Sequence, residues 1–448
     1  MTRALLHNAT IVNQGEAFAG YVAIEGDKIA QVGRGEPLWD RVPRGCQAVN
    51  LRGMLLLPGV IDDQVHFREP GMTHKADIAT ESRAAVAGGV TSYMDMPNNI
   101  PPATSLQALE AKYERAAQTS SANYSFYIGA TNDNIDELKR ADYSAVCGVK
   151  AFLGSSTGDM LVDDPRSIER IFGEVDAIIA AHSEDETIIR HNRSRYTARY
   201  GDDPPVALHP KIRSDEACYV CTARAIETAD RMGARLHVLH LSTAREMALL
   251  SDAPLPGKRI TAEVCVHHLW FCDDDYATLG SRIKCNPAIK TAADREALRE
   301  ALTAGRLDVV ATDHAPHLLG EKRGGCLKAA SGMPLVQFSL TAMLELALQG
   351  VMSVPDVARK MCHAPAELFG VDRRGFIRPG YYADLVVVDP DDPHVIEAGE
   401  VVSKCGWSPF EGVTMHSRVV ATYVNGELAY HRGVLTGQPR GMRLKFKR

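Results

Sequence analysis

The sequence lacks an excess of positive charge. Its 448 residues include 50 Lys and Arg against 56 Asp and Glu, so the formal net charge is −6. Proteins that bind nucleic acid or anionic membrane surfaces normally carry a basic excess. The charge balance therefore argues against both kinds of partner.

Long hydrophobic runs are missing as well. No apolar run approaches the roughly 20 residues that cross a bilayer. Residues 1–18 (MTRALLHNATIVNQGEAF) have no apolar core of the kind found in secretion signals. We therefore expect no membrane span and a cytoplasmic location.

The ten cysteines lack the pattern of a disulfide framework. In a chain this long without a secretion signal they are best interpreted as reduced thiols. Cys218 and Cys221 form a close pair, but they lie in a helical pattern and no second pair follows to complete a zinc site. We interpret these two as small core residues.

The two ends of the chain share a β-sheet pattern. Short alternating apolar segments broken by Gly, Asn and Asp fill residues 1–57, and the same style returns in residues 371–448 with an Asn-Gly turn at 425–426. Neither end has enough apolar residues to form a core alone. We predict that both ends pair into one β-domain, with residues 58–370 inserted between them.

The middle of the chain alternates short apolar strands with amphipathic helical segments. The predicted strands are residues 55–67, 90–96, 122–130, 146–154, 177–184, 235–242, 259–268 and 307–314. This alternation is typical of a (β/α)8 barrel, although a doubly wound sheet would show it too. Seven of the eight strands carry reactive side chains at or just past their C-terminal ends, where such barrels place active sites, and this favours the barrel.

Four of these strand-end side chains have the chemistry of metal ligands. They are His66, His182, His240 and Asp313. A single strand histidine is more often a core residue than a ligand, but a barrel would bring all four together. Imidazole and carboxylate ligands without sulfur suit zinc in a catalytic site.

Two strands add further candidates. Gln64, His66 and Arg68 alternate along the first strand, so their side chains face one space. Lys150 lies between apolar residues on the fourth strand, where an unpaired charge is costly to bury. His267 and His268 end the seventh strand, where alternation lets at most one of them face the site. Glu263 could orient His267, and a structural role for Glu263 is an equal alternative.

Seven segments resemble the signatures of the amidohydrolase superfamily and, within it, of the dihydroorotases. In chain order they are PGVIDDQVHFREPG, MPN, GVKAFL, HLST, AEVCVHH, NPAI and ATDHAPH. The terminal segments ADLVVVD and SKCGWSPFEG extend the resemblance over nearly the whole chain. It implies a (β/α)8 barrel with a small β-sandwich domain, the latter built from residues 1–57 and 371–448.

The resemblance also implies metal-assisted hydrolysis of a cyclic amide. His66, His182, His240 and Asp313 match metal positions, with Asp313 also the catalytic acid and base. Lys150 matches a lysine that many members carry in carboxylated form between two metals. One or two zinc ions per chain are therefore expected, with zinc-bound hydroxide interconverting dihydroorotate and N-carbamoyl-L-aspartate in pyrimidine biosynthesis.

The substrate contacts follow from the same resemblance. Arg68, Asn98 and His317 match contacts to the substrate carboxylate, and Asn286 matches a contact to the pyrimidine edge. An arginine can bind a carboxylate through two parallel hydrogen bonds. Residues 154–160 and 209–214 are candidates, on composition, for loops that close the site.

Gln64 departs from the family pattern, which has His-x-His on the first strand. An amide oxygen is a weaker zinc ligand than imidazole, so one of the two metal positions is expected to be weak, empty or completed by water. Besides a working dihydroorotase, two alternatives stay open. One is a hydantoinase-like or allantoinase-like hydrolase, and the other is a non-catalytic subunit that scaffolds a carbamoyltransferase. The expected partners are a small-molecule substrate, further copies of the chain in a dimer or tetramer, and aspartate carbamoyltransferase.

Overall fold

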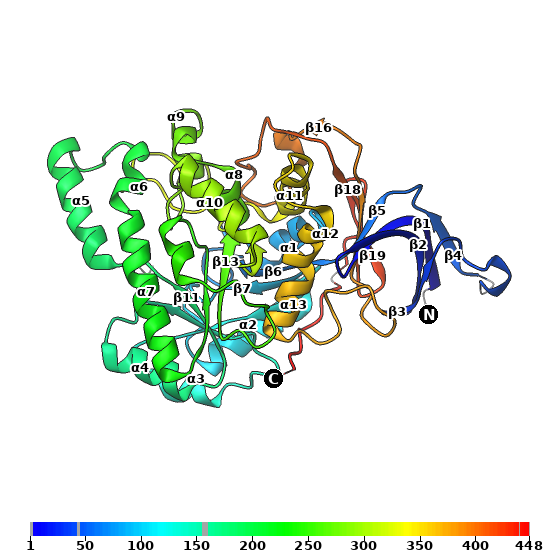
Figure 1. Ribbon diagram of the computed structural model, residues 1–448, viewed down its shortest axis with the longest axis horizontal. Helices are drawn as coiled ribbons and strands as arrows, with labels where there is room; N and C mark the ends of the chain where they lie inside the picture. The colour runs from blue at the N-terminus through cyan, green and yellow to red at the C-terminus, as the bar shows by residue number, and fades with distance from the viewer. Residues whose placement is uncertain (1–2, 43–44, 155–159, 439, 448) are drawn as a thin grey trace.

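Both ends of the chain meet in one β-domain beside a barrel (Figure 1). The computed structural model describes residues 3–42, 45–154, 160–438 and 440–447. The blue N-terminal strands and red C-terminal strands lie together at one side, and the cyan-to-yellow middle of the chain forms the barrel. The predicted fold class is confirmed: a (β/α)8 barrel with a small β-sandwich domain built from both chain ends.

Eight strand positions form the barrel, all parallel. The strands are β6 (Val60–Val65), β7 (Val90–Asp95), β8 (Asn123–Phe126) with its continuation β9 (Ile128–Gly129), β10 (Val149–Phe152), β11 (Ile178–His182), β12 (Arg235–Val238), β13 (Ile260–Cys265) and β14 (Val309–Ala311). Their residues are almost all buried, as expected for parallel strands covered on both faces. The last and first strands meet where the His66 N–H donates to the His314 carbonyl at 2.7 Å, next to a parallel bridge between Val65 and His314.

Thirteen α-helices surround the barrel in the described part of the chain. They are α1 (Ile78–Ala87), α2 (Leu106–Thr119), α3 (Ile135–Arg140), α4 (Pro165–Glu174), α5 (Glu186–Tyr200), α6 (His209–Ile212), α7 (Asp215–Met232), α8 (Val266–Trp270), α9 (Tyr276–Leu279), α10 (Ala292–Thr303), α11 (Ser339–Leu348), α12 (Val354–Ala358) and α13 (Ala364–Phe369). Side-chain oxygens of Asp, Ser or Thr cap several of these helices at their first turn, including Asp77 at α1 and Ser214 at α7. Within the described residues, no helix has both the length and the apolar character needed to span a membrane.

The β-domain is a nine-stranded sheet. Its strands are β1 (Arg3–Asn13), β2 (Glu16–Glu25), β3 (Lys28–Arg34), β4 (Gln47–Asn50), β5 (Leu55–Pro58), β15 (Leu385–Asp389), β18 (Arg418–Val424), β19 (Glu427–His431) and β20 (Val434–Leu435). β5 joins the two chain ends, because it runs parallel to β1 on one side and antiparallel to β15 on the other. A separate pair, β16 (His394–Val395) and β17 (Thr414–Met415), lies outside this sheet.

The chain passes from the β-domain into the barrel at Gly59. The sequence predicts one strand over residues 55–67, but the structure divides it into β5 and β6 on either side of this glycine. A Cβ at Gly59 would lie within 2.0–2.7 Å of Thr91 side-chain atoms, so only glycine fits where the two sheets come this close.

A buried polar network ties the β-domain to the barrel. Arg374 contacts the Asp384 carboxylate and donates to Asn425 Oδ1 at 2.8 Å. Asp384 also accepts a hydrogen bond of 3.2 Å from Asn123 on barrel strand β8. The side chains of Arg374 and Asp384 are only 4% and 2% exposed, so both charges depend on this pairing.

Replacing Arg374 with Met should lower the free energy of unfolding by about 3–5 kcal/mol, because it leaves the Asp384 carboxylate buried without its cation. Urea denaturation measures this. Arg373→Met is the matched control: Arg373 is the adjacent residue, but its side chain is 48% exposed and pairs with Asp372 at the surface, so its loss should change stability little. Equal effects of the two substitutions would contradict this account of the network.

Candidate active site

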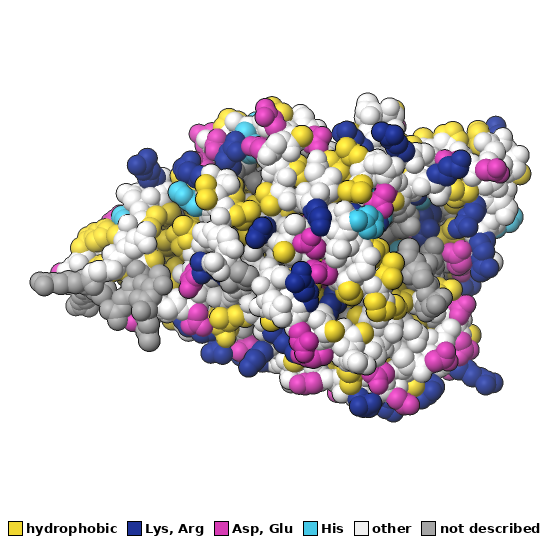
Figure 2. All heavy atoms as spheres, turned by 180° about the vertical axis from the view of Figure 1, so that it is seen from behind, with side chains coloured by type: hydrophobic (Ala, Val, Ile, Leu, Met, Phe, Trp, Pro, Cys, Tyr) yellow, Lys and Arg dark blue, Asp and Glu magenta, His cyan; other side chains and the backbone are white. Residues whose placement is uncertain are grey.

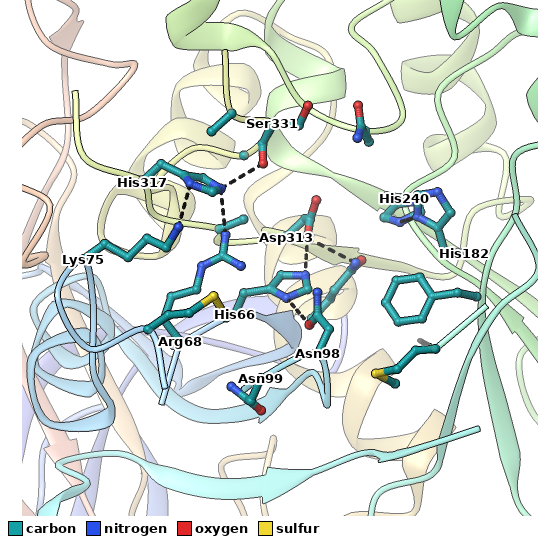
Figure 3. Close-up of a pocket in the computed structure, with 18 of the residues that line it drawn as sticks. His66, Arg68, Lys75, Asn98, Asn99, His182, His240, Asp313, His317 and Ser331 are labelled. Carbon is teal, nitrogen blue, oxygen red and sulfur yellow. Dashed lines mark hydrogen bonds and ion pairs between the residues drawn. The ribbon is translucent and has the colours of Figure 1, made fainter. Parts of the chain in front are cut away.

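A cavity of about 600 Å³ opens at the C-terminal ends of the barrel strands. All ten residues that the sequence predicts for the site line it: Gln64, His66, Arg68, Asn98, Lys150, His182, His240, Asn286, Asp313 and His317. Figure 3 labels His66, Arg68, Asn98, His182, His240, Asp313 and His317 among them. The barrel brings these side chains together from six strands and from the loop that holds Asn286, because parallel strands present their C-terminal ends at one rim.

His182 and His240 converge on one side of the cavity. His182 Nδ1 lies 2.9 Å from His240 Nε2, and His182 Nε2 lies 2.8 Å from Glu184 Oε2. The Glu184 carboxylate accepts the Nε2 proton, which leaves Nδ1 of His182 with a free lone pair. Burial lowers the pKa of both histidines below the usual value, so both rings are neutral and suited to bind a metal ion.

Glu184 is itself held by Arg213. Glu184 is fully buried, and Arg213 donates to its two oxygens from Nε at 3.0 and 3.1 Å and from Nη2 at 2.6 Å. Burial opposes ionisation of Glu184, but Arg213 and His182 outweigh it and hold the pKa of the carboxyl well below its usual range. The Arg213–Glu184 pair therefore fixes the tautomer and the orientation of His182.

His66 and Asp313 form a second convergent pair. His66 Nδ1 lies 2.8 Å from Asn98 Oδ1, an acceptor, so Nδ1 carries the proton in the neutral ring. The bare Nε2 faces Asp313 Oδ1 at 3.0 Å. Gln64 Nε2 donates to the same carboxylate oxygen at 3.2 Å.

Lys150 is buried and lines the same cavity as the two donor pairs. Its side chain has no carboxylate oxygen within 4.0 Å among the described residues, and Nζ lies 4.6 Å from the centre of the Phe152 ring. Burial, opposed by Asp313 and Glu263, lowers the pKa of Lys150 to about 7. The amine is therefore substantially neutral near pH 7, as a buried lysine without a carboxylate must be.

These donor sets fit a divalent metal ion. Two ligands at right angles around an ion with bonds of about 2.1 Å lie about 3.0 Å apart, and the two donor pairs are 2.9 and 3.0 Å apart. Without an ion, a His240 Nε2 proton bridges to His182 Nδ1 as a hydrogen bond, and an ion bound between the two rings would take the place of that proton. Gln64, His66 and Asp313 would hold an ion at one side, and His182 and His240 at the other.

Three of the site residues have strained backbones. Arg68, His240 and Asp313 have φ values of 66°, 39° and 48°, in the left-handed region that non-glycine residues rarely adopt. Glu263 Oε1 accepts the His240 N–H at 2.9 Å. Asp62 binds the Thr312 hydroxyl and N–H, at 2.6 and 3.2 Å, directly before Asp313. Buried carboxyl groups on neighbouring strands thus hold the backbone at His240 and directly before Asp313.

A cationic wall lies opposite the histidine pair (Figure 3). The Arg68 guanidinium is 7% exposed and has no carboxylate within 4.0 Å among the described residues. Its Nε donates to the Pro316 carbonyl at 3.2 Å, and Nη2 lies 3.1 Å from His317 Nε2.

Lys75 Nζ lies 3.1 Å from His317 Nδ1 and 2.9 Å from Glu321 Oε1. Burial, with Arg68 and Lys75 adding to it, holds the pKa of His317 far below its usual value, so this ring is neutral.

Two buried lysines hold the loop that follows this wall. Lys322 Nζ donates to the carbonyls of Lys284, Ala330 and Gly332 at 2.7–2.9 Å. Lys284 Nζ donates to Ser331 Oγ at 3.0 Å, and the Ser331 carbonyl lies 3.0 Å from His317 Nε2. Residues 329–334 (AASGMP) are therefore held in place along one side of the cavity.

His267, His268, Glu263 and residues 209–214 do not line the cavity. His267 and His268 are both buried and neither lines the cavity, because α8 begins at Val266 and ends the strand alternation there. Glu263 binds the His240 N–H and contacts His237 rather than orienting His267. Residues 209–214 include the buried helix α6 and the anchored Arg213. Of the other proposed loop, residues 155–159 lie outside the described part of the chain.

The sequence patterns do not reveal four of the site's supporting residues. Glu184 follows His182 by two positions on the same face, a signal that could have identified it. Arg213, Lys75 and Lys284 come from loops and helix ends whose spacing to the strands carries no pattern.

Residues 55–429 match the amidohydrolase family, and the chain belongs to that family. Its members are hydrolases, and the barrel, the histidine pairs and the buried lysine are consistent with that membership.

Relatives and solved structures agree with this assignment. The chain is 38% identical over 360 residues to a dihydroorotase of Halobacterium salinarum, covering 80% of this chain and 82% of that protein. It is 32% identical to an allantoinase of Bacillus velezensis, over 96% of this chain and 94% of the other. The structure of an L-hydantoinase (dihydropyrimidinase) from Arthrobacter aurescens superimposes with a TM-score of 0.93 at 25% identity, covering 99% of this chain and 100% of the other.

Glu184→Gln should weaken divalent-metal affinity about 10- to 100-fold, because the amide keeps the shape but loses the charge that fixes the His182 tautomer. Titration with Zn²⁺ or Co²⁺ against a competing chelator measures this affinity. Glu186→Gln, two residues further on at the start of α5, is the control and should leave it unchanged. Unchanged affinity in Glu184→Gln would refute the positioning role.

Proposed function

We propose that the protein is a dihydroorotase, which interconverts dihydroorotate and N-carbamoyl-L-aspartate. The observation that carries this proposal is the buried Arg68 guanidinium, which lines the cavity without a carboxylate partner among the described residues. A buried unpaired cation is costly and is satisfied when an anionic ligand binds beside it. Dihydroorotate carries a carboxylate on its ring, whereas hydantoin and allantoin do not.

The cationic wall would orient that carboxylate. Arg68 would bind it through two hydrogen bonds, with its guanidinium held in place by the Pro316 carbonyl. His317 and Asn98 lie beside the same space, and Asn286 faces it from the loop after α9. His209 Nε2 lies 3.0 Å from Asn286 Oδ1, so the Asn286 amide is held at one end and offers its N–H groups to the ring.

Metal chemistry completes the proposal. When bound at the histidine pairs, zinc would lower the pKa of a water towards neutrality and polarise the ring carbonyl. The neutral Lys150 amine can add carbon dioxide and release a proton, giving a carbamate whose oxygens suit a metal ion. Asp313 would accept a proton from the attacking water and transfer it to the leaving ring nitrogen, and Gln64 Nε2, which donates to its Oδ1, holds the carboxylate in position.

The other candidate functions fit these contacts less well. An allantoinase or hydantoinase has no substrate carboxylate for Arg68 to bind. A scaffold without activity would not need His182 and His240 to be neutral, buried and oriented by Glu184. Assembly into a homo-oligomer, association with aspartate carbamoyltransferase and a cytoplasmic location stay predictions.

Arg68→Met should reduce kcat/KM for dihydroorotate about 100-fold, because the substrate carboxylate would lose its charge-assisted hydrogen bonds. Arg68→Lys should restore little of this loss, since an ammonium cannot form the two parallel bonds. Steady-state kinetics of both variants test this, with the exposed Arg190→Met as control. Unaltered kcat/KM in Arg68→Met would rule out this recognition of the carboxylate.

Asp313→Asn should lower kcat for dihydroorotate by about 10²–10⁴-fold, because the amide cannot carry the transferred proton. Circular dichroism should show an unchanged fold, since Asn preserves the size of the side chain. Substantial residual turnover would assign the proton transfer to another group.

A further inference from the structure

Three side chains converge one layer deeper in the barrel than the cavity. Asp63 on β6, His237 on β12 and Glu263 on β13 are all fully buried, and none of them lines the cavity. Each offers a ligand atom, and these three atoms lie within 4.8 Å of one another. His237 Nε2 is 3.2 Å from Asp63 Oδ2 and 3.6 Å from Glu263 Oε2.

The facing atoms all carry unshared lone pairs. The Thr261 hydroxyl donates to the Leu236 carbonyl at 3.3 Å, so its oxygen accepts the His237 Nδ1 proton at 2.9 Å. This leaves Nε2 bare in the neutral ring. Nε2, both oxygens of Asp63 and Oε2 of Glu263 have no hydrogen-bond partner in the described part of the chain.

Across the part of the chain that the structure describes, no lysine or arginine neutralises the two carboxyl groups of this cluster. No Lys or Arg nitrogen of the described residues lies within 4.0 Å of Asp63 or Glu263. The other Glu263 oxygen is occupied by the His240 N–H. Two carboxylates in a dry interior are costly unless a cation lies between them.

We propose that Asp63, His237 and Glu263 bind a divalent transition-metal ion, at a site separate from the histidine pairs of the cavity. Separations of 3.2 and 3.6 Å between donors are those of neighbouring ligands around an ion with bonds of about 2.0–2.2 Å. Two carboxylates and one imidazole suit Mn²⁺, Fe²⁺ or Zn²⁺. Asp63 is the residue next to Gln64, which stands where the family pattern has a histidine. Strand β6 therefore places a carboxylate below the cavity, beside the position of the missing histidine.

The backbone of β6 explains how neighbouring side chains reach both layers. The register between β6 and β7 shifts between Asp62 and Val65, so strict alternation is interrupted there. Gln64 therefore lines the cavity while the adjacent Asp63 contacts His237 inside the barrel.

The alternative to a metal ion is a proton on His237 Nε2, shared with Asp63 and Glu263. Burial alone would lower the pKa of His237, but Asp63 and Glu263 raise it to about 9, so the metal-free ring carries a proton. Neither contact of Nε2 has hydrogen-bond geometry, however, which favours an ion that all three donors can contact.

The test counts metal ions in chains whose cavity ligands are removed. The variant His66→Asn/His182→Asn/His240→Asn, which disables both cavity donor pairs, is stripped with chelator, reloaded with Mn²⁺ or Zn²⁺, desalted and measured by elemental mass spectrometry. We expect it to retain about one equivalent per chain and to show a higher melting temperature with metal than without. Adding Asp63→Asn should remove both the equivalent and the shift, and adding Glu263→Gln should do the same.

Asp308→Asn is the matched control, because Asp308 is a buried carboxylate that pairs with Lys258 and belongs to no donor cluster. It should leave the retained equivalent in place. If the cavity variant retains no metal, the cluster holds only a proton. If one equivalent of metal remains after Asp63→Asn is added, the ion is bound elsewhere. Either result overturns the proposal, and neither depends on the reaction that the cavity catalyses.

Discussion

The site depends on closure of the barrel between its last and first strands. The hydrogen bond from the His66 N–H to the His314 carbonyl and the adjacent bridge at Val65 join β14 to β6. This closure places His66 beside Asp313, two residues that are 247 positions apart in the sequence. Without it the two ends of the barrel sheet would be free edges, and the donor pair of His66 and Asp313 would not exist.

Unpaired buried charge identifies where ligands are needed. Among the described residues, Arg68 has no carboxylate within 4.0 Å, and Asp63 and Glu263 have no lysine or arginine nitrogen within that distance. Between them lie neutral donors, because burial lowers the pKa of His182, His240 and Lys150. Most buried charges elsewhere are matched within the chain, as Arg374 is by Asp384 and Arg213 by Glu184. Buried lysines without a carboxylate partner, such as Lys322, donate to backbone carbonyls instead.

The sequence predicts the eight strands and the strand-end site residues because both follow local rules, whereas Asn98, Asn286 and His317 are expected only from the resemblance to the family. Apolar runs of strand length alternate with helical patterns, and polar side chains such as His182 and Asp313 stop these runs at one end. Alternation fails where the backbone changes type, as at His267, where helix α8 has already begun, and at Asp63, where β6 shifts register. Pairings such as Arg213 with Glu184 join segments whose proximity only the folded chain creates. The division of one predicted strand at Gly59 likewise depends on how closely the two sheets approach.

The central claim is that Arg68 recognises a carboxylate on the substrate ring. Dihydroorotate and dihydrouracil share the same ring and differ in this carboxylate, so the ratio of their kcat/KM values on the zinc-loaded protein tests the claim most directly. A site built for a polar group rejects the analogue that lacks it, and we expect dihydroorotate to be preferred by about 10³-fold or more. Equal rates, or a preference for dihydrouracil, would contradict the account.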